Sequence, residues 1–501
     1  MFSGFYKLIL VFLFFIMLLC WGFLLIPYQQ TLHLIQQFLL SNYDYATQLY
    51  IIKKFVSISL LMYLKTFLVL FSTSLFVLFY FFKDFITIRI HQNWYVFKQF
   101  KINTFPPLWY VLIISFVFKM YFLVHLPLHL DELFSFLYLT SKGFFTTISY
   151  YPGPNNHVFY NILVVILLKL NVPIVLSIRL PSLLASLVVQ YLLFEIGLRF
   201  FSQRKALLLA LVPCVANYFF FYSVQGRGYV LAIMLFIMAL YFFYFFNQPK
   251  LIVAILMGLS LFTIPTMILP IISWVLFVRF YKQLRLKDIL KLMSFMLLFT
   301  LLFYSQILFV TGSKALFMNG WVTQHLSFAQ FISSLPQQLL QYFQFFVGFD
   351  SFWVLLLLIP MGFIFKKSTF NVFFGCNLIV FLGWILVMKQ FPFSRIFLII
   401  HLLFYIFWVV NLEKWILLQL FLLFTVANLT FNIFQTSEFI ASQNVENQKL
   451  TKMLSKSWQH QNLSCKNEYD YYYFQFLITD IKSNIKLVWN QNQHERFKYI
   501  N

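Results

Sequence analysis

The sequence predicts an all-α, polytopic membrane protein with about 12 transmembrane helices and a small polar tail. Of its 501 residues, 62% are hydrophobic and 10% are charged, whereas a soluble domain carries about 25% charged residues. Because so few polar groups cannot cover the apolar surface of this chain, its solvent must be lipid. Many of the apolar stretches also approach the length of about 20 residues that a helix needs to cross a bilayer.

The formal net charge of +22 is explained by the membrane. In a soluble protein such a charge would suggest nucleic-acid binding. Here Lys and Arg cluster in short loops between apolar stretches, which is typical of loops that anchor helices on the cytoplasmic side. We therefore expect membrane lipids, and no nucleic acid, as partners. The four cysteines form no close pair in the sequence, so no disulfide or metal framework is predicted.

Residues 1–106 are predicted to form two N-terminal transmembrane helices and a cytoplasmic loop. The first apolar stretch, Leu8–Pro27, lacks a small-residue cleavage site and is followed by further spans, which indicates a retained helix rather than a signal peptide. Basic residues place the loop after the second apolar stretch inside; they are Lys83, Arg89, Lys98 and Lys101. The stretch 107–128 then runs outward and brings Asp131 and Glu132 to the outer face.

The chain between Glu132 and Arg279 contains six apolar segments, although an outer start and an inner end require an odd number of crossings. The segments are 157–170, 180–197, 206–222, 228–246, 251–264 and 266–280. Either 251–280 is one helix broken at Pro265, or 157–170 enters the membrane without crossing it. The positive-inside rule favours the second interpretation, because it places LRFFSQRK inside and QGRG outside.

The remaining segments follow from the same charge pattern. The basic stretches RFYKQLRLK and FKK indicate cytoplasmic loops, so residues 311–351 form an external loop. Its amphipathic run FAQFISSLPQQLLQYF predicts a helix that lies in the membrane interface. Residues 352–434 are predicted to hold the C-terminal transmembrane helices. By parity the tail, 435–501, which is rich in Asn, Gln, Lys and Tyr, is external.

Ionisable residues gather in a band at the outer face. The chain has 14 acidic residues, and two of them, Asp131 and Glu132, stand side by side. Three other loops bring Asn155, Asn156 and His157, then Arg179, then Arg227. Each has a simpler explanation: acids favour helix N-termini, Asn suits turns and caps, and Arg snorkels to head-groups. Together they are candidates for a functional site, because ionisable groups that face a cavity in a membrane protein are commonly functional.

The order of these stretches resembles the membrane glycosyltransferases of the C-type fold. The shared pattern is the acidic pair followed by PNNH, RLPSLL and RGY. The nearest families in this pattern are the dolichyl-phosphate-mannose–protein mannosyltransferases (family 39) and their bacterial branch of aminoarabinose and lipopolysaccharide sugar transferases. The resemblance covers residues 107–310, which would be the catalytic module, and FPFSRIFLI looks like the family's late Arg-bearing helix start. It does not include 1–106 or 435–501.

The resemblance implies an enzyme that takes a sugar from a polyprenyl-phosphate carrier. In the family an acid of the first external loop acts at the acceptor, and this acid corresponds to Asp131; Glu132 matches the second acid of the motif. Basic residues hold the lipid phosphate, and the candidates here are Arg227, Arg179, Arg395 and Lys389. Candidates for binding the acceptor or the sugar are Asn155, Asn156, His157 and His325. For His157, a neutral side chain that makes a hydrogen bond at a helix start is the favoured alternative.

The chemistry of glycosyl transfer fits these residue types. The reaction needs a base that takes the acceptor proton and positive charge where the phosphate leaves. One carboxylate opposite the leaving group would give inversion in a single displacement. A neighbouring acid would raise the pKa of Asp131 unless an arginine or a metal offsets it. No spacing requires a cofactor, although Mg²⁺ or Mn²⁺ bridging Asp131 and the phosphate is compatible with the residues.

A transporter or flippase for lipid-linked glycans, without transferase activity, is the alternative. Transporters place charges at the midplane of their spans, whereas the spans here are nearly free of acids and the ionisable groups lie at one face. The acceptor is a lipid, a glycan or a protein. Abundant Phe, Lys, Ile and Asn fit a bacterial chain, so the expected location is the inner membrane of a bacterial cell, with the site facing the periplasm.

Overall fold

The computed structural model describes most of the helical part of the chain. The described residues are 2–39, 58–81, 105–153, 156–246, 250–312, 327–347, 369–389 and 391–411, with single residues and short pieces at 48, 426, 430, 463–465, 472–473, 475–476 and 487–489. The chain is mostly helical, which confirms the coarse prediction of fold class. Two short strands, β1 (Leu463–Cys465) and β2 (Leu487–Trp489), pair in parallel.

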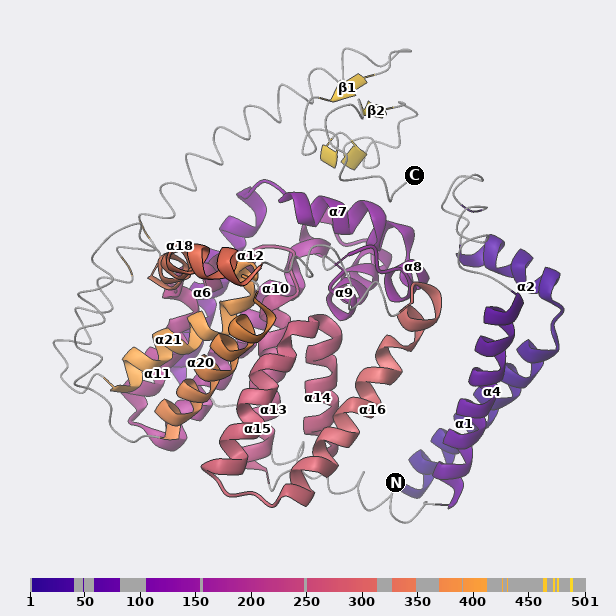
Figure 1. Ribbon diagram of the computed structural model, residues 1–501, viewed down its shortest axis with the longest axis horizontal. Coiled ribbons are helices and arrows are strands. Elements are labelled where there is room, and N and C mark those ends of the chain that lie inside the picture. The colour runs from indigo at the N-terminus through magenta and orange to yellow at the C-terminus, as the bar shows by residue number, and fades with distance from the viewer. Residues whose placement is uncertain are drawn as a thin grey trace.

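The helices form a main bundle and a separate N-terminal pair (Figure 1). The N-terminal elements are α1 (Phe2–Leu25), α2 (Tyr28–Leu34), η1 (Ile35–Leu39) and α4 (Ile58–Phe81). The main bundle contains α6 (Pro106–His125), α7 (Leu130–Tyr138), η2 (Thr140–Lys142), α8 (Phe144–Ser149), α9 (Val158–Lys169), α10 (Ile174–Phe200), α11 (Gln203–Val215), α12 (Asn217–Val224), α13 (Tyr229–Phe245), α14 (Lys250–Thr263), η3 (Pro265–Met267), α15 (Ile268–Phe280), α16 (Leu286–Val310), α18 (Phe328–Val347), α20 (Thr369–Met388), η5 (Ser394–Phe397) and α21 (Leu398–Asn411).

In the N-terminal pair, α1 and α4 pack along each other and a sharp bend follows α1. The chain bends by 118° between the helical segments before and after Pro27, because proline cannot continue the hydrogen-bond ladder of a helix interior. The buried side chain of Lys65, on α4, donates to the Ile26 carbonyl at 2.5 Å and to Thr31 Oγ1 at 2.8 Å. A lysine in an apolar helix therefore satisfies a carbonyl at the bend.

Several helices are long and apolar enough to cross a membrane. Among the described residues they are 106–125, 174–200, 369–388 and 394–411, four in all, or six if the bent pairs α1–α2 and α11–α12 each count as one span. Helices α9, α13, α14 and η3–α15 are apolar but shorter. The structure thus has the helices of a membrane protein, whereas the predicted number of about 12 spans is not reached in the described part of the chain.

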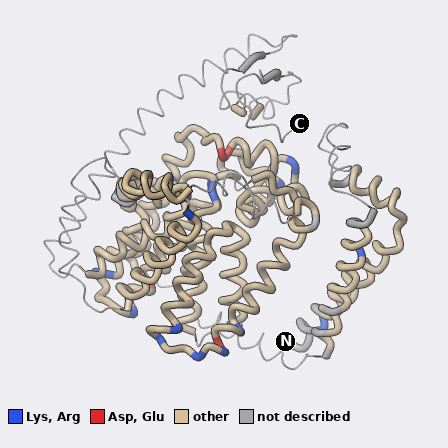
Figure 2. Tube along the Cα trace, viewed as in Figure 1, with Lys and Arg blue, Asp and Glu red and all other residues tan. Residues whose placement is uncertain are grey.

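From α10 to α15, the helices of the main bundle run alternately between two ends. We call the end that carries α7 the α7 end; there lie Arg179 near the start of α10, Gly226 before α13 and the end of α14 at Thr263. At the opposite end, Lys205 reaches Val410 and Tyr281 reaches Thr369. Lys and Arg gather at this opposite end, around the loop after α15 (Figure 2), as expected for a cytoplasmic face.

This path bears on the ambiguous segment between Glu132 and Arg279. Helix α9 has 12 residues, so its length is about 18 Å at 1.5 Å per residue. The hydrocarbon core of a bilayer is thicker, about 30 Å. Helices α14 and α15 are separate and meet at Pro265 on the α7 end. The observed path therefore has α10, α11–α12, α13, α14 and α15 running between the two ends, in agreement with the interpretation that 157–170 does not cross.

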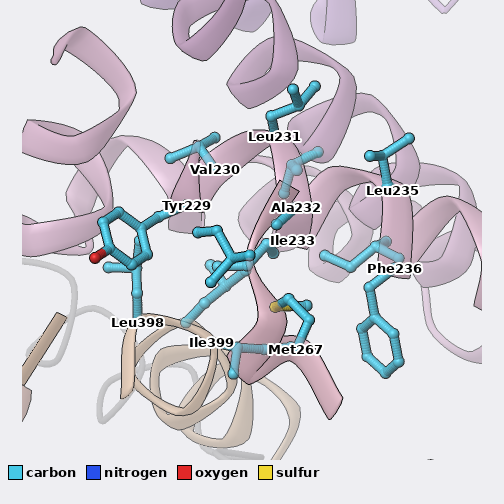
Figure 3. Packing of buried hydrophobic residues seen from close by; sticks show 14 of the residues in the cluster. Tyr229, Val230, Leu231, Ala232, Ile233, Leu235, Phe236, Met267, Leu398 and Ile399 are labelled. Atoms are coloured by element: carbon cyan, nitrogen blue, oxygen red, sulfur yellow. The ribbon is translucent and has the colours of Figure 1, made fainter. Parts of the chain in front are cut away.

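The core is built around α13, a helix that is apolar on every side and accordingly buried. It packs against α10 and α14. Figure 3 shows Tyr229, Ile233 and Phe236 of α13 among Leu398 and Ile399 of α21 and Met267 of η3. This packing brings the starts of α13 and α21 together, and each start carries a basic residue just before it.

Candidate functional site

The acidic pair lies in the first turn of α7. His129 is the N-cap: its Nδ1 accepts a hydrogen bond from the backbone N–H of Asp131 at 3.2 Å. In return the Glu132 carboxylate accepts from the backbone N–H of His129 at 2.7 Å. This reciprocal capping box satisfies N–H groups that a helix start leaves without partners. The HLDE sequence therefore fixes both carboxylates relative to the helix.

Glu132 forms a buried, bidentate ion pair with Arg179. Both side chains are 0% exposed, and Nε and Nη2 of Arg179 each donate to a carboxylate oxygen at 2.8 Å. The other guanidinium N–H groups donate at 2.7–2.8 Å to three carbonyls, that of Leu123 in the last turn of α6 and those of Leu126 and Pro127 in the loop that follows. All N–H donors of the guanidinium group are thus used within the protein, and none is left for a lipid phosphate.

Gly226 completes this buried group. Its backbone N–H donates to Glu132 Oε1 at 2.5 Å. A Cβ at this position would lie 2.9 Å from Glu132 Oε1 and 2.9 Å from the Ile178 carbonyl oxygen, so only glycine allows so close an approach. Glu132 therefore connects α7, α10 and the loop between α12 and α13. Burial raises the pKa of Glu132, and the Arg179 charge and the hydrogen bonds outweigh this effect, so the pKa lies below its ordinary value.

Asp131 lies between two arginines. Its Oδ2 is 3.1 Å from Arg227 Nη2 and 2.9 Å from Arg395 Nη1. Arg227 comes from the loop before α13, and Arg395 from η5, which is 264 residues away in the sequence. The exposed fraction of the side chain is 13% for Asp131, 2% for Arg227 and 23% for Arg395, so this group borders on solvent whereas the Glu132 group does not.

The charges around Asp131 set its ionisation. Burial raises the pKa of the carboxyl, but the guanidinium groups of Arg227 and Arg395 outweigh it and hold the pKa below its ordinary value. His129 Nδ1 lies 3.8 Å from Asp131 Oδ2 and accepts a backbone N–H, so it carries no proton there. Burial lowers the pKa of His129 despite the neighbouring acids. At neutral pH, Asp131 is therefore a carboxylate beside a neutral histidine.

A cavity of about 230 Å³ opens beside this group. Its lining combines the charged residues with aromatic and amide side chains: His129, Asp131, Tyr218, Phe221, Tyr222, Gln225, Arg227 and Arg395. The volume is below the about 300–1,000 Å³ of typical ligand pockets, so it suits a compact polar group rather than a whole lipid. Arginines that border an open cavity can grip a phosphate in bidentate fashion.

Two further predicted site residues, Asn156 and His157, are buried in the protein. The Asn156 side chain, 1% exposed, donates to the carbonyls of Thr147 and Tyr150 at 3.1 and 2.8 Å and accepts from Asn161 at 2.9 Å. It therefore fastens the loop after α8 to α9. His157 is buried against Tyr229, and its Nε2 has no hydrogen-bond partner among the described residues.

His157 is held neutral by its surroundings. Burial lowers its pKa well below the ordinary value, and the charges of Arg227 and Arg395 lower it further. Its side chain makes no capping hydrogen bond at the start of α9. The favoured alternative of a neutral histidine therefore agrees with the structure, whereas the capping bond is not present.

Of the other predicted residues, Lys389 directly follows α20 and lies over the Phe328 ring, with 5.8 Å from Nζ to the ring centroid. It does not line the cavity. Asn155 and His325 lie outside the described residues. Sequence reasoning did not identify His129, Tyr218, Tyr222 or Gln225. The signals were present: His129 precedes the acidic pair, and Tyr218 and Tyr222 are one helical turn apart just before the Arg227 loop.

The charged residues of the site do not form a recognisable metal centre. Within the described part of the chain, no group of three or more His, Cys, Asp and Glu side chains is arranged to hold a metal ion. Comparisons with protein-family models, characterised proteins and solved structures give no match. The resemblance to C-type glycosyltransferases therefore depends on the quoted motifs, and the geometry around Asp131 is the physical basis for any proposal of function.

Proposed function

We propose that the protein is a membrane glycosyltransferase of the C-type fold, with about 12 spans. It would move a sugar from a polyprenyl-phosphate-linked donor to an acceptor on the external face. The observation that supports this most is the placement of one ionised carboxylate, Asp131, between Arg227 and Arg395 at the edge of a cavity. A base and a phosphate-binding pair side by side are the two elements that the reaction needs.

In the proposed reaction, Asp131 accepts the proton of the acceptor hydroxyl while that oxygen bonds to the anomeric carbon. The bond from the anomeric carbon to the phosphate oxygen breaks, and the phosphate leaves with the electron pair. Arg227 and Arg395 stabilise the charge on the departing phosphate. Because a single carboxylate acts from the face opposite the leaving group, the configuration inverts.

In the proposed reaction, Arg227 and Arg395 exchange part of their contact with Asp131 for contact with the donor phosphate. In the structure both contact Asp131 Oδ2, and an entering phosphate would take over part of their hydrogen bonding. Asp131 would then lose some of the positive charge that lowers its pKa, and would become a better base at the moment when the donor is in place. Glu132 and Arg179 act as positioning residues, since neither is exposed. If the reaction uses a divalent cation, the Asp131 carboxylate would help to hold it, and the cation would supply positive charge for the departing phosphate.

The proposed location is the inner membrane of a bacterium, with the α7 end facing the periplasm. The gathering of Lys and Arg at the opposite end (Figure 2) supports this orientation. A lipid-borne donor would then reach the cavity from the outer leaflet, and the acceptor from the periplasm.

The test uses the cell envelope, because the sugar and the acceptor are not specified. A deletion strain is complemented with the wild-type protein, Asp131→Asn or the control Asp288→Asn, and envelope lipids, glycans and proteins are compared by mass spectrometry. Asp288 lies at the opposite end and pairs with Arg285. We expect a hexose or pentose increment that needs the protein and falls at least about 100-fold with Asp131→Asn, at equal protein level.

Binding of undecaprenyl phosphate to the purified protein tests the roles proposed for the charged residues. Asp131→Asn should keep this binding, whereas Arg395→Gln should weaken it. A protein that moves lipid-linked glycans without transferring sugar would leave no sugar increment dependent on Asp131. A wild-type glycan profile in the Asp131→Asn strain would refute the assignment.

A further inference from the structure

The opposite end of the main bundle contains a second, apolar pocket. Its volume is about 470 Å³, within the about 300–1,000 Å³ range of ligand pockets. Helices α10, α13, α15, α20 and α21 supply its walls, with side chains such as Leu193, Phe236, Trp274 and Leu402. The lining shares no residue with the cavity beside Asp131, so this pocket plays no part in the proposed reaction.

The walls offer almost nothing to a polar ligand. The Trp274 indole N–H already donates to the Tyr244 hydroxyl at 3.2 Å, and the Tyr281 hydroxyl lies 3.3 Å from Thr369 Oγ1. The remaining lining is aliphatic and aromatic apart from Lys282. Such a surface favours a hydrocarbon chain, because burying polar groups here would cost free energy without new hydrogen bonds.

Cations surround the pocket at this end. The Arg199 guanidinium lies over the Phe245 ring at 5.3 Å, Lys205 Nζ over the Phe201 ring at 5.8 Å and Lys282 Nζ over the Tyr281 ring at 5.5 Å. All three rings line the pocket. Arg199 and Lys282 are exposed and Lys205 is half-buried. Positive charge therefore stands at the edge of an apolar pocket.

The acidic residues close to these cations are fewer than the cations. Asp288 pairs with Arg285 at 3.1 Å, and Glu195 is half-buried on α10, one helical turn before Arg199. Basic pockets between transmembrane helices on the cytoplasmic side are typical sites for anionic lipid head-groups.

We infer that this pocket binds an anionic phospholipid of the leaflet at the opposite end. One acyl chain lies between α10, α13, α15, α20 and α21, and the phosphate lies against Arg199, Lys205 and Lys282. The lipid fills a space that the helices leave open and holds α20 and α21 against α10 and α13. Its site is independent of the polyprenyl-phosphate donor, which would enter at the α7 end.

Native mass spectrometry of the detergent-purified full chain tests this inference. The protein is delipidated and titrated with dioleoylphosphatidylglycerol or dioleoylphosphatidylcholine, which differ in the head-group alone. We expect one phosphatidylglycerol to be retained at least about fivefold more than phosphatidylcholine, which corresponds to about 1 kcal/mol. Equal retention of the two lipids would overturn the inference, because it indicates a non-specific lipid shell.

Two sets of variants test the pocket itself. The pair Arg199→Gln and Lys282→Gln should abolish the preference for phosphatidylglycerol, whereas the control pair Arg204→Gln and Lys287→Gln should keep it. All four side chains are exposed, so none of these changes should prevent folding, and neither control residue lines the pocket. A preference that survives the first pair, or is lost with the control pair, contradicts the site.

Two further tests separate the contribution of the lipid's acyl chain to binding from that of its head-group. Leu240→Trp places an indole in the pocket and should reduce retention of both lipids. Glycerol phosphate, which carries the anionic group without an acyl chain, should not displace phosphatidylglycerol at millimolar concentration. Full displacement would show that the acyl chain adds nothing and would overturn the inference. A failure here leaves the sugar-transfer test unaffected, since that test concerns the α7 end.

Discussion

Asp131 and Glu132 are adjacent in the sequence, yet their carboxylates occupy different environments. Glu132 is fully buried and saturated by Arg179, His129 and Gly226, whereas Asp131 is 13% exposed and faces a cavity between two arginines. Consecutive residues of a helix project in different directions, so α7 can direct one acid into the protein and the other toward solvent. One carboxylate positions the loop, and the other is available for chemistry.

Glu132→Gln should strongly destabilise the protein. The change leaves the Arg179 charge buried without its counter-ion, and breaking such a pair from one side typically costs about 3–5 kcal/mol. The apparent melting temperature in detergent, measured by tryptophan fluorescence, should fall by several degrees. Asp288→Asn, a matched change at an exposed ion pair, should alter it little. A Glu132→Gln protein that melts like the wild type would show that the pair does not support the fold.

The same pair predicts a pH dependence of stability. Because the pKa of Glu132 is lowered in the folded state, its contribution is present above its unfolded value of about 4.3 and is lost as the pH falls through the folded pKa. The wild-type melting temperature should therefore fall on acidification below this value. Glu132→Gln should lack that part of the decrease, and a parallel decrease in both proteins would contradict the mechanism.

Gly226→Ala should also destabilise the site. The added Cβ would contact the Ile178 side chain, Glu132 Oε1 and the Ile178 carbonyl, and such overpacking costs about 1–3 kcal/mol. Gly383→Ala is a matched control, since no atom lies within 4 Å of a Cβ at that position. Thermal unfolding of the two variants should separate them. If Gly383→Ala lowers stability as much as Gly226→Ala, the close approach at Gly226 is not the cause.

Arg395→Gln should shift the pH profile of the proposed reaction. Asp131 acts in its ionised form, which predominates above its pKa. Burial raises that pKa, but the charges of Arg227 and Arg395 outweigh burial and lower it. Removing one guanidinium raises the pKa, so the acidic limb of the rate should move to higher pH. Rates of sugar transfer by purified protein across pH would measure the shift, with Arg285→Gln as the control. An unchanged limb with a lower rate would assign Arg395 to phosphate binding alone.

Asn156→Ala should loosen the loop after α8. The change removes two hydrogen bonds to buried carbonyls and one from Asn161, and each buried group left without a partner costs about 1–3 kcal/mol. Limited proteolysis should cut residues 150–153 of this loop faster than in the wild type. Asn371→Ala, which removes the exchange of hydrogen bonds with Asn411 at the opposite end, should leave this loop protected.

Much of the fold could be predicted, because the length of the apolar stretches and the charge of the loops determine where the helices lie. The stretches 107–128, 228–246 and 251–264 correspond to α6, α13 and α14 within a few residues. The stretch 206–222 is instead two helices bent by 65°, and α10 begins at Ile174 rather than at 180. Composition alone cannot locate such a break or start, because both depend on tertiary packing.

The candidate site could be predicted only in part. The motifs selected Asp131, Arg227 and Arg395, which the fold brings together from three distant segments. They also selected Glu132 and Arg179 for chemistry, although the structure uses both for support, since residue type does not reveal burial. Tyr218 and Tyr222 were missed because aromatic residues on an apolar helix resemble ordinary core.

The contact between Asp131 and Arg395 has a consequence for biosynthesis. A ribosome adds about 5–20 residues per second, so the 264 residues that separate the two side chains take about 10 to 50 s. During that interval the nascent chain holds the carboxylate without its second arginine. Premature termination before η5 would therefore leave an inserted polypeptide whose site lacks Arg395, and the proposed sugar transfer could begin only after η5 and α21 had joined the other helices.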